Sequence, residues 1–222
     1  MYIKSVNVIQ STDEDPQGQV GNTSAKTLKS LEFLRRLGLY CHPDFLTSQS
    51  LLSLLKYANT AQHEPARVFA GGPGAVVDTA ARNTFQVPLD DRANVLNDHI
   101  GALCPDLARH FAMPLTGHEG PSLLHYQPGG FYEAHVDRAD EGEAHLPPVR
   151  RRISMVIFLN PGDYSGGALT LYGLVDDPAW KTFGFAIEPS PGLLVAFPSH
   201  IVHEVTPVTA GDRFTIVDWF TA

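Results

Sequence analysis

The sequence predicts a mainly β fold with flanking helices (α+β): a double-stranded β-helix, or jelly roll, with N-terminal helices packed on it. Its first half repeats leucine at helical spacing, its second half carries eight short strand-like segments, and no linker separates the halves. We expect residues 1–24 to form a flexible arm and residues 25–222 a single domain. Helical support should span residues 25–120, and the jelly-roll core residues 121–222.

The predicted helices are amphipathic and carry recognisable ends. Residues 25–40 place leucines three apart, from Leu28 to Leu37, before Gly38 stops the helix. Residues 43–61 repeat the pattern with Thr47 or Ser48 as the cap. The apolar face expected for that second helix consists of Leu51, Leu52, Leu55 and Ala58.

A third helical region is expected over residues 91–113, interrupted at Pro105. Residues 68–89, which precede it, form a Gly-rich loop followed by a strand-like run. The eight strand candidates of the second half are separated mostly by Gly, Pro, Asn or Asp. They cover residues 122–127, 131–136, 152–160, 168–173, 183–188, 192–198, 203–208 and 213–220.

Composition excludes several classes of function. A chain with 222 residues, 43% hydrophobic and a net charge of −8 has enough apolar material for a core but no basic excess for nucleic acid. Cys41 and Cys104 form neither a disulfide framework nor a zinc motif. The sequence shows no secretory signal and no apolar run near the roughly 20 residues of a membrane span. We therefore expect a cytoplasmic protein without a membrane or nucleic-acid partner.

The segment "YEAHVDR" (residues 132–138) suggests a metal site. If the segment is extended, His135 and Asp137 point to the same side, because strand residues two apart share a face. The pattern His-x-Asp is common by chance, so a third ligand must support it.

Two of the chain's ten histidines are candidates for that ligand, His200 and His203. We prefer His203, since it begins a predicted strand while His200 lies in the turn before it. His125 points opposite to Tyr126 on its strand. Two histidines and one carboxylate on a β scaffold are typical of non-haem Fe(II) oxygenases. A zinc hydrolase can use the same donors but usually carries His-Glu-x-x-His on a helix, a motif absent from this sequence.

Arg213 follows His203 by ten residues and shares a strand face with Thr215. A buried arginine needs an anion, and its planar guanidinium suits a carboxylate. The pair could hold the distal carboxylate of a dicarboxylate cosubstrate. The alternative is that Arg213 forms an ion pair with Asp212 or Asp218.

Four segments together resemble the prolyl 4-hydroxylase-like Fe(II)/2-oxoglutarate-dependent dioxygenases: "LLHYQPGGFYEAHVD", "RRISMVIFLN", "YSGGALTLY" and "PGLLVAFPSHIVHEVTPVTAGDRF". The resemblance covers roughly residues 120–220 and implies a jelly roll. It implies Fe(II) held by His135, Asp137 and His203, and 2-oxoglutarate held by Arg213 with Tyr126 and Thr215. Many animal members carry a further tyrosine on the next strand, and the matching position is Ile157.

The resemblance implies a hydroxylase that uses Fe(II), 2-oxoglutarate and O₂ and releases succinate and CO₂. The expected substrate is a prolyl residue in a peptide, a free amino acid or an amino-acid-derived metabolite. The alternative is a cupin-like metal- or ligand-binding module without turnover, which has no need of Arg213. Two loops could cover the site, residues 70–81 and residues 138–152; we expect residues 138–149 to act as a lid. Arg150, Arg151 and Arg152 could anchor a substrate carboxylate.

Overall fold

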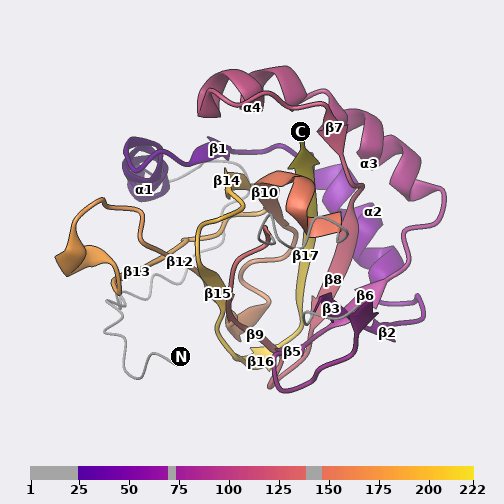
Figure 1. Ribbon diagram of the computed structural model, residues 1–222. Helices are drawn as coiled ribbons and strands as arrows, with labels where there is room; N and C mark the ends of the chain where they lie inside the picture. The colour runs from indigo at the N-terminus through magenta and orange to yellow at the C-terminus, as the bar shows by residue number, and fades with distance from the viewer. Residues whose placement is uncertain (1–24, 70–73, 139–146) are drawn as a thin grey trace.

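Two β-sheets pack face to face, and helices cover the outer side of the larger one (Figure 1). The computed structural model describes residues 25–69, 74–138 and 147–222. The predicted N-terminal arm and most of the predicted lid lie outside these residues.

The larger sheet has eight strands and is antiparallel throughout. Along the sheet the order is β1 (Tyr40–His42), β14 (Leu194–Pro198), β10 (Arg151–Phe158), β17 (Arg213–Thr221), β8 (Ser122–Tyr126), β6 (Phe85–Val87) and β2 (Glu64–Pro65), with β7 (Gly117–His118) paired to β17.

The smaller sheet has five strands, in the order β13 (Gly184–Ala186), β12 (Leu169–Tyr172), β15 (His203–Val205), β9 (Phe131–His135) and β5 (Arg82–Asn83). Two short antiparallel pairs complete the described strands: β3 (Val68–Phe69) with β4 (Ala75–Val76), and β11 (Tyr164–Gly166) with β16 (Val208–Gly211). Each of the eight predicted segments contains a strand, so the mainly β prediction is confirmed. The strand-like run predicted within residues 68–89 is instead divided among four short strands.

Helices α1 (Ala25–Arg36), α2 (Ser48–Ala58), α3 (Arg92–Gly101) and α4 (Cys104–Phe111) occupy the predicted regions. Thr47 is the N-cap of α2, and its side chain accepts a hydrogen bond from the Ser50 amide. The predicted face of α2 is partly wrong: Leu52 is 70% exposed, and Leu54 is buried in its place. Residues 51, 54 and 58 follow the helical period more closely than a run through residue 52.

The third helical region breaks earlier than predicted. Helix α3 ends at Gly101, and Pro105 lies in the first turn of α4, where its missing N–H removes no intrahelical bond. The break is therefore at residues 102–103, and the proline begins the second helix rather than interrupting the first.

Two hydrophobic cores lie on opposite faces of the large sheet. The outer core joins α2, α3 and α4 to alternate residues of the sheet, including Ile153, Met155 and Ile157 of β10. The inner core lies between the sheets and takes the intervening residues, such as Val156 and Phe158, together with Leu31 and Leu34 of α1. Leu28, which was also predicted on this helix face, has a side chain outside the part of α1 that the structure describes. Helices α2, α3 and α4 thus cover one side of the large sheet, while its other side faces the smaller sheet.

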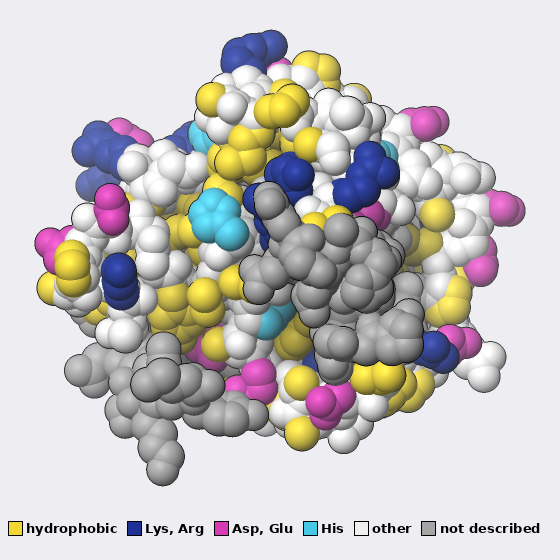
Figure 2. All heavy atoms as spheres, viewed as in Figure 1, with side chains coloured by type: hydrophobic (Ala, Val, Ile, Leu, Met, Phe, Trp, Pro, Cys, Tyr) yellow, Lys and Arg dark blue, Asp and Glu magenta, His cyan; other side chains and the backbone are white. Residues whose placement is uncertain are grey.

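None of the helices in the described ranges is long and apolar enough to cross a membrane. Over the face drawn in Figure 2, acidic side chains are spread mainly around the edge, while basic ones gather at a few places, including its centre. Cys41 and Cys104 are both free thiols, as expected.

Candidate active site

His135 and His203 are brought together by the smaller sheet. His135 ends β9, His203 begins β15, and the two are direct cross-strand partners. Their ring centroids lie 4.2 Å apart. His200, the other candidate, is exposed and does not belong to the cluster. The antiparallel register therefore selects between two histidines that are close in sequence.

Asp137 completes the cluster from just beyond the end of β9. Its backbone amide donates to the carbonyl of Ser199, and its carboxylate oxygens lie 3.6 Å from His135 Nε2 and 3.4 Å from His203 Nε2. The strand predicted over residues 131–136 ends at His135, so Asp137 lies beyond it, and the bond to Ser199 fixes the backbone that carries the carboxylate. The Ser154 hydroxyl also donates to Asp137 Oδ2, at 2.7 Å.

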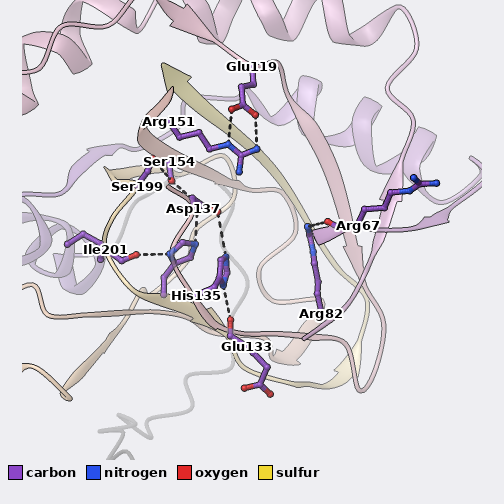
Figure 3. Close-up of polar contacts among 11 residues, drawn as sticks. Arg67, Arg82, Glu119, Glu133, His135, Asp137, Arg151, Ser154, Ser199 and Ile201 are labelled. Atoms are coloured by element: carbon purple, nitrogen blue, oxygen red, sulfur yellow. Dashed lines mark hydrogen bonds and ion pairs between the residues drawn. The ribbon is translucent and has the colours of Figure 1, made fainter. Parts of the chain in front are cut away.

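Backbone carbonyls orient both imidazole rings. His135 Nδ1 lies 2.7 Å from the carbonyl oxygen of Glu133, and His203 Nδ1 lies 2.9 Å from that of Ile201. Each carbonyl can only accept, so each Nδ1 carries hydrogen and each Nε2 lies toward Asp137. Figure 3 shows this arrangement for His135. One ligand atom from each of the three residues lies within 4.8 Å of the others. Two imidazole nitrogens and one carboxylate oxygen form a donor set that suits non-haem iron.

The three groups also adjust each other's protonation. Burial by itself raises the pKa of Asp137, but His203 and His135 outweigh it and hold this pKa well below its usual range. Burial lowers the pKa of His203, but the neighbouring Asp137 carboxylate raises it by more, so the net shift of the His203 pKa is upward. Burial and the neighbouring His203 lower the pKa of His135. The carboxylate is therefore ionised and ready to attract a cation.

Arg213 is one of the largest fully buried side chains, with 1% of its surface exposed. Its Nη1 donates to the Thr215 hydroxyl at 3.3 Å, and its Nε has no partner among the described residues. Both acids considered as partners bind elsewhere: Asp212 pairs with His125, and Asp218 pairs with His118. The ion-pair alternative is thus wrong for the described residues. A buried guanidinium in this state has capacity for an added anion.

Arg213, Tyr126 and Thr215 line the same cavity as the His–Asp–His cluster. Tyr126 is the cross-strand partner of Arg213, and the guanidinium carbon lies 4.8 Å from its ring centroid. Gly167, at φ +62°, makes room for the arginine, because a Cβ there would lie 2.8 Å from Arg213 Cδ. The predicted residues therefore form two groups in one cavity, one with metal-ligand chemistry and one with a free cation.

Ser154 and Arg82 line the cavity but were not predicted from the sequence. Ser154 could have been noticed as a polar residue in the apolar run of β10, but nothing in the sequence marks Arg82. Arg82 is buried, donates from Nη1 to the Arg67 carbonyl and keeps an unpaired Nε. The Tyr132 ring stacks on the His135 ring and also contacts the Arg82 guanidinium. In Figure 3 the Arg67 side chain points away from the cluster.

Of the three consecutive arginines, only Arg151 lines the cavity. It forms a bidentate pair with Glu119, at 2.8 and 2.7 Å, and its guanidinium lies 3.7 Å from the Trp219 ring centroid. Its carboxylate partner is thus supplied by the protein. Ile157 packs in the outer core, so Val156 is the residue at this part of β10 that faces the cavity.

Similarity to known proteins was found at the levels of family, sequence and structure. The family described as the 2OG-Fe(II) oxygenase superfamily matches residues 121–221. A PKHD-type hydroxylase of Stenotrophomonas maltophilia is 31% identical over 185 residues, which cover 80% of this chain and 75% of that protein. The PKHD-type hydroxylase YbiX of Escherichia coli is 30% identical, covering 82% and 77%.

Two solved structures share the fold. A prolyl-4-hydroxylase of Pseudomonas putida has a TM-score of 0.60 at 20% identity, covering 87% of this chain and 97% of that one. A prolyl hydroxylase from Trichoplax adhaerens, solved with a hypoxia inducible factor peptide fragment, has a TM-score of 0.62 at 19% identity, covering 89% and 93%.

Proposed function

This chain belongs to the 2OG-Fe(II) oxygenase superfamily and is a hydroxylase that uses Fe(II), 2-oxoglutarate and O₂; on that premise we propose that it hydroxylates an unactivated C–H bond of a prolyl residue in a peptide. Hydroxylation by such an enzyme draws its oxidising power from the bound metal, cosubstrate and dioxygen, with succinate and CO₂ as products. The protein supplies binding, orientation and exclusion of water. The observation that carries the proposal is one cavity holding both the His–Asp–His cluster and the unpaired Arg213.

In this proposal His135, Asp137 and His203 hold the Fe(II). Support comes from a cluster in which His203 is buried and His135 and Asp137 are partly buried, with both Nδ1 atoms bonded to carbonyls and the Nε2 atoms left for a metal. Ser154 steadies the carboxylate by donating to Oδ2. A fixed ring and a fixed carboxylate reduce the reorganisation that metal binding requires.

Arg213 would bind the distal carboxylate of 2-oxoglutarate, with Tyr126 and Thr215 adding hydrogen bonds. Support comes from the burial of all three side chains around the unpaired guanidinium. An arginine fork binds a carboxylate with two directed bonds and so selects a dicarboxylate over a mono-acid. Without such a ligand, the positive charge would remain buried and unpaired, which is costly.

We also propose that the two facing sheets form a double-stranded β-helix within a single domain over residues 25–222. The eight strands predicted from the sequence divide evenly between the sheets, with β8, β10, β14 and β17 in the larger and β9, β12, β13 and β15 in the smaller. Helices α2, α3 and α4 share the outer core with the larger sheet, which supports a single folding unit.

The proposal of a prolyl-peptide substrate is supported by the rest of the cavity wall. Arg82, with an unpaired buried Nε, and the aromatic rings of Tyr132 and Trp219 line it beside the metal-ligand cluster. The Arg82 guanidinium lies 4.7 Å from the Tyr132 ring centroid. A donor next to aromatic faces suits a pyrrolidine ring flanked by peptide carbonyls or a carboxylate.

The test is succinate release from 2-oxoglutarate by the Fe(II)-loaded protein, with a panel of proline-containing peptides, free proline and other amino acids. A prolyl peptide should increase succinate release and gain one oxygen atom by mass spectrometry. Asp137→Ala should abolish both signals, while His200→Ala, which alters an exposed histidine outside the cluster, should retain them. Oxidation of free amino acids but of no peptide would contradict the peptidyl substrate. Metal binding without 2-oxoglutarate binding would instead favour the cupin-like module.

A further inference from the structure

A chain of hydrogen-bonding groups lies on the outer face of the large sheet, directly behind Arg213. Asp212 immediately precedes Arg213, and its Oδ1 lies 2.6 Å from Nε2 of His125. On its other side, His125 Nδ1 lies 2.9 Å from Nδ1 of His63. His63 Nε2 lies 2.8 Å from the carbonyl oxygen of Ala58, the last residue of α2. The chain therefore runs from a helix end to a carboxylate through two imidazole rings.

Counting hydrogens shows what this arrangement requires. Both ends, the Ala58 carbonyl and the ionised Asp212, can only accept hydrogen bonds. The three contacts therefore need three N–H hydrogens on the four ring nitrogens of His63 and His125. Two neutral imidazoles carry only two hydrogens between them. All three hydrogen bonds thus form together when the two imidazole rings hold one extra proton between them. The resulting positive charge faces the carboxylate of Asp212.

The same segment is held from a second direction by Asn160, which is buried. Its side-chain amide donates to the Asp212 carbonyl at 2.8 Å, and its side-chain oxygen accepts from the Phe214 amide at 2.9 Å. His125 also stacks on the Phe214 ring, with centroids 4.4 Å apart and planes 12° from parallel. The backbone is therefore fixed on both sides of Arg213.

We propose that His125, supported by His63 and paired with Asp212, is a positioning residue for Arg213, and that the shared proton makes 2-oxoglutarate affinity depend on pH. This inference rests on the proposed role of Arg213 in holding 2-oxoglutarate. Within the cavity, the hydrogen bonds of Arg213 among the described residues reach no further than Thr215. The orientation of the Arg213 side chain therefore depends on the position of its backbone. A small displacement of a binding group weakens binding strongly.

The direction of the pH effect follows from the groups around His125. Among the described residues, the titratable or charged ones that contact His125 are His63, from the segment after α2, and Asp212, just before β17. Phe85 and Phe214 supply uncharged rings. Burial lowers the pKa of His125, while Asp212 opposes this by raising it, and the net shift is downward. When the extra proton leaves, one of the three contacts loses its hydrogen and the pairing with Asp212 loses its charge. Affinity for 2-oxoglutarate should therefore fall as pH rises.

The positioning role is tested by calorimetric titration of 2-oxoglutarate into the full chain loaded with Zn(II), which does not turn over. Asp212 is 53% exposed on its side chain, so Asp212→Ala should fold. We expect binding about three- to tenfold weaker in this variant, the range typical of one lost hydrogen bond. Asp163→Ala removes an exposed carboxylate from the nearby turn after β10 and should bind like the parent chain. In the Fe(II) enzyme, Asp212→Ala should raise KM for 2-oxoglutarate and leave kcat unchanged.

Arg213→Ala distinguishes the positioning role of His125 and Asp212 from the carboxylate-binding role of Arg213. If Arg213→Ala weakens binding and Asp212→Ala does not, the positioning role is wrong and the carboxylate-binding role stands. If Arg213→Ala binds 2-oxoglutarate like the parent chain, both are wrong. Equal weakening by Asp163→Ala would attribute the effect to net charge and also overturn the positioning role.

The shared proton is tested by nitrogen-15 NMR of the histidine rings in the Zn(II)-loaded chain and by the same titration between about pH 5 and 8, where histidine titrates. At the acidic end, His63 and His125 should show three N–H groups between them. His63→Gln removes the second ring but leaves Asp212 paired with His125, and any effect of pH on the metal-ligand cluster is common to both proteins. The ratio of the two affinities should therefore change with pH. A constant ratio, or only two N–H groups at every pH, would overturn the shared proton.

Discussion

The two faces of strand β17 bury their polar groups in different ways. On the outer face, under the helices, the fully buried Asp218 is paired with His118. On the inner face, Arg213 and Thr215 are equally buried but bond only to each other, and the arginine Nε is unpaired. Burial with partners serves the fold, while burial without them requires a ligand. The contrast teaches that unpaired buried groups identify a binding face better than burial does.

The strongest test of this contrast removes an inner ligand. His203→Ala should abolish Fe(II) binding and turnover, because a cluster reduced to one histidine and one carboxylate loses most of its affinity. Iron per chain, measured by atomic emission after anaerobic loading, checks this. His200→Ala is the matched control and should keep nearly full stoichiometry. An iron-free His200→Ala protein with an iron-loaded His203→Ala protein would reverse the ligand assignment.

The next effect concerns the inner cation. Arg213→Ala should raise KM for 2-oxoglutarate by roughly one to three orders of magnitude, since losing a buried charged partner costs about 2–4 kcal/mol. Iron stoichiometry should change little, because the side-chain hydrogen bond that Arg213 forms among the described residues is to Thr215 and not to the His–Asp–His cluster. Succinate release at increasing 2-oxoglutarate provides the measurement. An unchanged KM would show that the buried guanidinium has another purpose.

A smaller effect is expected from the inner hydroxyl. Thr215→Val keeps the side-chain volume but removes the group that accepts from Arg213. Affinity for 2-oxoglutarate should fall by roughly three- to tenfold, which corresponds to about 1 kcal/mol for one hydrogen bond. Calorimetric titration into the Zn(II)-loaded protein measures this. If affinity is retained, the Thr215 hydroxyl accepts the Arg213 hydrogen bond only when 2-oxoglutarate is absent and does not contribute to cosubstrate binding.

Ile216, the outer-face residue next to Thr215, should have the smallest effect on 2-oxoglutarate binding when it is substituted. Ile216 is fully buried among the helices, and Ile216→Val should cost about 1 kcal/mol in the free energy of unfolding. It should leave KM for 2-oxoglutarate and iron content unchanged. Urea unfolding and the succinate assay together measure both quantities. A rise in KM as large as that of Thr215→Val would mean that the two faces are not functionally separate.

Local patterns explain what could be predicted from the sequence. Eight strands, three helical regions, the Thr47 cap and the shared cavity side of Arg213 and Thr215 follow from periodicity and capping, which act over a few residues. The resemblance of four linked segments to a known family supplied the iron and cosubstrate roles. Errors occurred where neighbouring elements decide, as with Leu52, which lies outside the contact that α2 makes with the sheet.

The sequence by itself determined the residue types that can hold a metal and a dicarboxylate, their order along the chain, and the alternation that places them on one side of a strand. Only the tertiary structure decided which of them meet. The cross-strand register joined His203 rather than His200 to His135, and His125 and His118 engaged the two aspartates beside Arg213 and Trp219. These outcomes depend on contacts between residues far apart in the chain, which periodicity over a few residues cannot specify.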